Sequence, residues 1–137
     1  MNRLPFEQPV EDIVYLKICE GISLHKRAMK ALLEDGGFNH DESTLLYYDV
    51  INEALETLND AFIYAECSPH HKMKKVIKAL DDYFRIIDAV AEDGIFTCAL
   101  TETEVIKMTA EAGQILDLSE QYSRECIDIT DFPSDES

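Results

Sequence analysis

The stretch STLLYYDVINEALETLNDAFIYA, residues 43–65, decides the fold class because its apolar residues recur every three or four positions. That period gathers them on one side of an α-helix, whereas a half-buried strand would alternate apolar and polar residues. Either Asp41 or Ser43 can accept from the free N–H groups in the first turn of such a helix. We therefore expect a well-buried helix, and its core line contains Tyr47, Ile51, Ala54, Leu58, Ala61 and Ala65.

Three further segments show the same helical period. One follows Pro9 and ends near Gly36, a residue that suits a helix C-terminus. Ser68 and Pro69 are typical of a helix start, and Thr101 with Glu104 forms the pattern of a capping box. The expected core lines are Val14, Ile18, Ile22, Met29 and Leu32, then Met73, Val76, Ile77, Leu80, Phe84, Ile87 and Val90, and lastly Val105, Met108, Ala112, Ile115 and Tyr122.

Short connections between the four expected helices favour an all-α, antiparallel up-down-up-down four-helix bundle. The predicted organisation is an extended N-terminal arm at 1–9, the bundle at 10–127, and an acidic disordered tail at 128–137. An alternative is a bundle of five or six shorter helices. Gly21 and Gly113 would then be the break points, because glycine weakens a helix interior.

A shift of 58 residues aligns the sequence with itself and suggests a duplicated helical hairpin. Such a duplication would relate the two hairpins by a pseudo-twofold axis. The matched pairs are Arg27 with Arg85, Ala31 with Ala89, Glu34 with Glu92, Asp35 with Asp93, Gly36 with Gly94, Phe38 with Phe96, Glu53 with Glu111, Ala54 with Ala112, Leu58 with Leu116, and Tyr64 with Tyr122.

The composition excludes several classes of function. With 28 acidic against 12 basic residues, the formal net charge is −16, which disfavours direct binding to nucleic acid. No apolar run is long enough for a membrane span or a signal peptide, so we expect a cytoplasmic protein. The separate cysteines are expected to be free thiols, and Cys67, His70 and His71 to form a solvated corner. We expect no metal and no cofactor.

The distribution of charge carries the functional prediction. No Lys or Arg occurs from Ala31 to His71, whereas acidic residues continue throughout. Four of them form the acidic stripe, which lies along one side of the second helix because its spacing is four, three and four: Asp49, Glu53, Glu56 and Asp60. We expect a non-catalytic regulator, inhibitor or adaptor/chaperone whose stripe binds a basic protein surface and imitates nucleic-acid phosphates.

Two enzymatic alternatives stay open. His71, Met73, Lys74 and Lys75 resemble the His-x-Leu-Lys-Gly pattern of histidine phosphotransfer domains, which implies phosphate transfer through His71. The resemblance covers five residues, and Lys75 stands where that family has glycine. The pair Glu53 and Glu56 could instead hold Mg²⁺ in a small helical enzyme similar to nucleotide pyrophosphohydrolases, although the second Glu-x-x-Asp of that family is missing.

Further predictions concern the surroundings of individual polar and aromatic residues. His25 lies on the apolar line of its helix, so we expect a hydrogen-bonded, partly buried ring. The cluster Lys72, Lys74, Lys75 and Lys78 is expected to pair with Asp60 and Glu66 of the preceding helix. Surplus aromatic surface from Tyr15, Tyr47, Tyr48 and Tyr64 makes a homodimer a further expectation.

Overall fold

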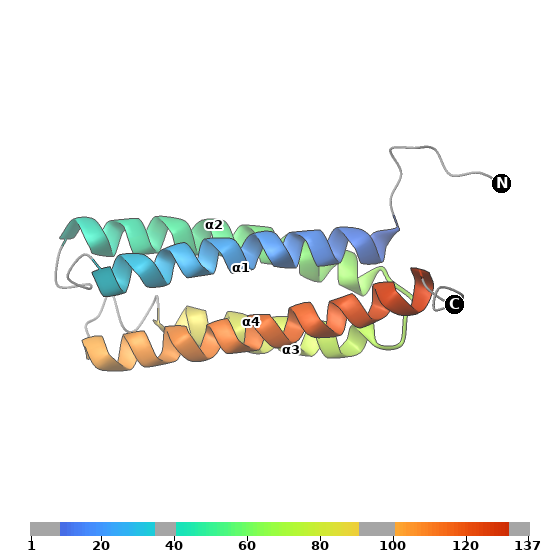
Figure 1. Ribbon diagram of the computed structural model, residues 1–137. Coiled ribbons are helices and arrows are strands. Elements are labelled where there is room, and N and C mark those ends of the chain that lie inside the picture. The colour runs from blue at the N-terminus through green and yellow to red at the C-terminus, as the bar shows by residue number, and fades with distance from the viewer. Residues whose placement is uncertain (1–8, 35–40, 91–100, 132–137) are drawn as a thin grey trace.

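The computed structural model describes residues 9–34, 41–90 and 101–131, which form four α-helices (Figure 1). Helices make up 92% of these residues, and no strand occurs among them, so the all-α class is confirmed. None of the helices in these ranges is long and apolar enough to cross a bilayer. The helices are α1 at Val10–Glu34, α2 at Asp41–Glu66, α3 at Met73–Ala89 and α4 at Glu102–Asp131.

The helices lie side by side along one long axis (Figure 1). α1 and α2 form one layer, and α3 and α4 form the other. The main contacts join α1 to α2, α2 to α3, α3 to α4, and α4 back to α1. The core therefore lies between the two layers, and every helix presents its apolar side to it.

The core line expected for α2 is confirmed, since all six of its residues are buried. Val14, Ile18 and Leu32 are buried on α1, while Ile22 and Met29 are half-buried. On α3 the expected line is buried except at the half-buried Ile77 and Phe84, and it is joined by Tyr83. Apolar side chains at helical spacing thus account for three of the four buried faces.

The two glycines considered as break points lie inside unbroken helices, so the prediction of shorter pieces is wrong. A Cβ added at Gly21 would lie 2.5 Å from the Leu58 side chain, a distance that real Cβ atoms do not reach. A Cβ added at Gly113 would lie 3.2 Å from the ring of His25. Glycine at these positions admits a close neighbour, and packing against that neighbour offsets its low helix propensity.

α3 begins later than the Ser68 and Pro69 signal predicts. The Ser68 hydroxyl accepts the His70 N–H at 3.1 Å, and His70 Nδ1 accepts the Lys72 N–H at 3.1 Å. Both side chains therefore satisfy N–H groups of a turn, and α3 starts only at Met73. Ser68 also donates to Glu11 of α1, which ties this turn to the neighbouring helix.

α4 begins at the expected capping box but buries a different side. The Glu104 N–H donates to Thr101 Oγ1 at 3.1 Å, and the Thr101 N–H donates to Glu104 Oε1 at 2.8 Å. Of the expected core line, only Val105 and Ala112 are fully buried. Among the α4 side chains that the structure describes, the other buried ones are Thr109, Leu116, Ser119, Ser123 and Cys126. Small polar side chains thus take core positions, and Ile115 and Tyr122 stay half-buried.

The expected terminal segments lie mostly beyond the described ranges, at 1–8 and 132–137. At one end, Pro9 precedes α1, and its carbonyl accepts the N–H groups of Asp12 and Ile13. At the other end, α4 continues to Asp131, four residues past the expected end of the bundle.

Candidate functional site

The acidic stripe lies on the outer side of α2, and all four of its residues are exposed. They face away from the buried line of the same helix, which explains how a core helix can carry them. Asp60 forms an ion pair of 3.9 Å with Lys17 of α1. Within residues 9–34, 41–90 and 101–131, the other three carboxylates have no ion pair.

Exposed apolar side chains stand at both ends of the acidic stripe. Leu46 precedes Asp49 by three residues, Ile63 follows Asp60 by three, and these two side chains are 45% and 51% exposed. The helical spacing therefore continues from one to the other, over about 25 Å of helix. Beside the stripe, Leu55 and Phe84 contribute to a hollow between α2 and α3 that Glu56 borders. The exposure of Leu46 and Ile63 was not predicted, because the outer residues of α2 were grouped by charge alone.

In the described part of the chain, the lysines near the start of α3 form no ion pair with Asp60 or Glu66, so the prediction of that pairing is wrong. Lys72 lies 3.7 Å from Glu125 of α4, and Lys78 lies 3.2 Å from Asp82 of its own helix. Lys72, in the turn before α3, therefore pairs with α4, whereas Lys78 pairs within its own helix.

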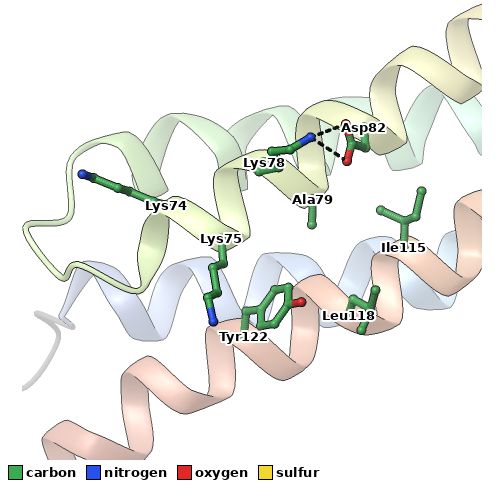
Figure 2. A pocket seen from close by; sticks show the side chains of 8 residues that line it. All are labelled: Lys74, Lys75, Lys78, Ala79, Asp82, Ile115, Leu118 and Tyr122. Carbon is green, nitrogen blue, oxygen red and sulfur yellow. Dashed lines mark hydrogen bonds and ion pairs between the residues drawn. The ribbon is translucent and has the colours of Figure 1, made fainter.

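Lys74, Lys75 and Lys78 border a groove between α3 and α4 with a volume of about 390 Å³ (Figure 2). The Lys75 ammonium lies 5.4 Å from the centre of the Tyr122 ring, a cation–π distance. Between the lysines and α4 lies an apolar floor that includes the 45% exposed Leu118. We call this the lysine groove, and its lining is Lys74, Lys75, Lys78, Ala79, Asp82, Ile115, Leu118 and Tyr122.

His71 lies in the turn between α2 and α3, where its exposed ring stacks on His70 at 5.1 Å between ring centres. It precedes the first residue of α3, whereas a helix starting at Ser68 and Pro69 would have included it in the first turn. The phosphotransfer alternative stays a prediction. In the part of the chain that the structure describes, His, Cys, Asp and Glu form no group of three or more that could hold a metal ion.

A buried polar cluster in the core joins all four helices. One ring nitrogen of His25, Nδ1, lies 2.9 Å from the Tyr83 hydroxyl, and Nε2 lies 2.8 Å from the Thr109 carbonyl oxygen. The Tyr47 hydroxyl lies 3.1 Å from Thr109 Oγ1, which donates to the Val105 carbonyl at 2.7 Å. The expectation of a hydrogen-bonded His25 is confirmed, and the ring is only 3% exposed.

The partners fix the protonation of this core network, which consists of His25, Tyr47, Tyr83 and Thr109. A carbonyl oxygen only accepts, so Nε2 of His25 carries the hydrogen and Nδ1 accepts from Tyr83. Burial lowers the pKa of His25, although the Thr109 carbonyl and Asp117 oppose this, and the ring is therefore neutral. Burial likewise raises the pKa of Tyr83, and it raises the pKa of Tyr47 to about 12. Both ring nitrogens are occupied, so this network holds the helices together.

The tyrosines expected to enlarge the surface are divided between core and exterior. Tyr47 is fully buried, so the prediction that it contributes to a dimer surface is wrong. Tyr15 and Tyr48 are half-buried, and Tyr64 is 39% exposed, beside Ile63. The homodimer stays a prediction. Comparisons with models of protein families, with curated proteins and with solved structures find no match to this chain.

Proposed function

We propose that this protein is a non-catalytic binding module whose acidic stripe docks on a basic surface of another protein. The observation that carries the proposal is the exposure of the whole stripe between two exposed apolar residues, Leu46 and Ile63. Carboxylates steer a basic partner and set its orientation, while apolar side chains at the ends supply contact area that excludes water. α2 thus combines the two components of a docking surface.

The spacing of the stripe suggests which kind of basic partner it suits. Successive carboxylates on one side of a helix lie about 5–6 Å apart, which is comparable to the separation of phosphates along a nucleic-acid strand. A protein whose basic site binds phosphates could accept α2 in their place. This protein would then act as an inhibitor or regulator of a nucleic-acid-binding protein, or as its adaptor or chaperone.

We propose a cytoplasmic location for this activity. Among the described residues, no disulfide joins Cys19, Cys67 or Cys126, which is typical of a reducing compartment. Cys98 lies outside the described residues.

We also propose the antiparallel up-down-up-down topology and its origin as a duplicated hairpin. The cyclic order of helix contacts supports the topology. Under the 58-residue shift, α1 corresponds to α3 and α2 to α4. His25 and Tyr83 are equivalent positions under this shift, and they contact each other, as residues near a pseudo-twofold axis do.

Capture of partners from a cell lysate tests the proposed function. The tagged protein and its E53K/E56K variant are each exposed to the lysate at low salt, and bound proteins are identified by mass spectrometry. We expect a basic protein on the unmodified chain and at least tenfold less of it on the variant. Duplex DNA added as competitor should release it, because both ligands use the same phosphate-binding site.

The matched control is E20K/E111K, which changes the net charge equally at two exposed positions of α1 and α4. This control should retain the partner and the helical circular dichroism of the unmodified chain. Equal capture by E53K/E56K and by the control would contradict the proposal, since the stripe would then be ordinary solvated surface.

A further inference from the structure

The lysine groove is a second candidate surface, and its chemistry is opposite to that of the acidic stripe. Lys74, Lys75 and Lys78 lie within one turn of α3, in a chain with only 12 basic residues and a net charge of −16. Below them, α3 and α4 contribute an apolar floor (Figure 2). The groove is therefore a local basic and apolar region on an acidic protein.

The floor exists because α4 buries small polar side chains in the core. Ser119 and Ser123 are fully buried, while the larger Ile115 and Tyr122 are half-buried and Leu118 is 45% exposed. An isolated bundle would gain more by placing the large apolar residues inside. The orientation of α4 thus leaves apolar surface beside the lysines of α3.

The lysines are placed unfavourably for the isolated helix. Lys74 and Lys75 occupy the first turn of α3, at the positive end of the helix dipole, where cations are destabilising. Lys78 is paired with Asp82, and Lys75 lies over Tyr122, but Lys74 has no ion pair among the residues placed by the structure. A bound carboxylate would interact favourably with both the lysines and the N-terminal end of α3.

We propose that the lysine groove binds an amphipathic, acidic helix of a partner protein. Apolar side chains of that helix pack on Ile115, Leu118 and Tyr122, and flanking Asp or Glu side chains pair with the lysines. Carboxylates one helical turn apart match Lys74 and Lys78, which are also one turn apart. The groove lies open between two helices, and this shape suits a helix laid along it better than an enclosed small molecule.

A pair of labelled synthetic peptides tests this proposal. Both are helical 15-residue peptides with the same leucine face, and one carries Glu where the other carries Lys on the flanking positions. The net charge of −16 alone would favour the basic peptide. We expect the acidic peptide to bind saturably and to shift the amide resonances of residues 74–82 and 115–122, whereas the basic peptide leaves those resonances in place.

Two variants and two controls locate the contact. Leu118→Asp and K74E/K75E should each weaken binding of the acidic peptide at least tenfold. Leu33→Asp, at a 59% exposed leucine of α1, and K30E/K107E, at exposed lysines, should change it less than twofold. Circular dichroism of all four variants should match that of the unmodified protein.

Three outcomes would overturn the proposal. The first is that the acidic peptide does not bind saturably. The second is that the control variants weaken its binding as much as Leu118→Asp and K74E/K75E do. The third is that chemical-shift changes are confined to residues outside 74–82 and 115–122. Displacement of the peptide by monomeric dodecanoate at equal concentration would assign the groove to a small amphiphile. A dimer in sedimentation analysis that Leu118→Asp dissociates would assign it to a second copy of this chain. Because this surface is separate from the acidic stripe, E53K/E56K should bind the acidic peptide unchanged, so the two proposals can fail independently.

Discussion

Polar side chains of the core network are buried and hydrogen-bonded, whereas those of the acidic stripe are exposed. In the core network, Tyr47 and Tyr83 both donate hydrogen bonds, and His25 bonds through both ring nitrogens. Along the stripe, Glu53 and Glu56 are exposed and have no ion pair in the described part of the chain. The first arrangement stabilises one packing of four helices, whereas the second leaves charge free to meet a partner.

This difference separates residues that define the fold from residues that are available for function. An unpaired polar group costs free energy when it is buried, because water can no longer solvate it. An exposed carboxylate keeps its water, so its removal changes stability little. Stability measurements should therefore respond strongly to the core network and weakly to the stripe, and capture of the proposed basic partner should show the reverse.

The largest expected effect follows from His25→Ala. The substitution removes a buried ring and leaves the Tyr83 hydroxyl and the Thr109 carbonyl without their partner. We expect the free energy of unfolding to fall by about 2–4 kcal/mol, measured by urea denaturation. Glu53→Ala serves as the control and should change it by less than about 0.5 kcal/mol. If the two substitutions lowered the free energy of unfolding equally, the core network would contribute no more to stability than the acidic stripe.

A smaller effect concerns pH. The folded protein has a His25 pKa below the ordinary value of 6.5, so folding favours the neutral ring. The stability from this ring is fully present above about pH 6.5 and is lost as the pH falls through the lower pKa of the folded state. Tyr83 of α3, Tyr47 of α2 and Asp117 of α4 are the titratable groups that accompany it, and the tyrosines stay protonated there.

The measurement is the difference in unfolding free energy between the unmodified protein and His25→Gln from pH 8 to pH 5. A difference is required because protonation of surface carboxylates also relieves the repulsion of a chain with net charge −16. We expect the advantage of the unmodified chain to shrink as the pH falls below about 6.5. An advantage that grows toward pH 5 would show that the folded state favours the charged ring.

The sequence predicted α2 well because the spacing of its residues indicates both its buried and its exposed side. Its buried apolar line and its acidic stripe fall on opposite sides of the helix, so both could be predicted from spacing, whereas the exposure of Leu46 and Ile63 beside the stripe could not. The same reasoning failed on α4, where Thr109, Ser119 and Ser123 are buried. The buried side of α4 was predicted from its largest apolar residues. This prediction failed because small polar side chains occupy several of the buried positions.

The partners of His25 were beyond sequence reasoning for a different reason. Spacing along one helix predicted that the ring would be buried, but Tyr83 and Thr109 lie 58 and 84 residues away. Such pairs depend on how the helices are rotated against each other, which side-chain packing decides. The lysine cluster shows the same limit, since Lys72 pairs with Glu125 of α4, far away in the sequence, instead of with α2.

The smallest expected effect tests the stripe itself. Glu53 lies four residues after Asp49 and three before Glu56, so it takes part in two repulsive pairs on α2. Glu53→Gln removes this repulsion and should stabilise the protein by a few tenths of a kcal/mol. Glu53→Lys also creates two attractive pairs, and we expect about twice that gain, measured by urea denaturation at low salt. High salt should reduce both gains, because exposed charges are screened. If Glu53→Lys instead destabilises the protein at low salt, Glu53 has a favourable contact with the folded chain, and the stripe is then not free for a partner.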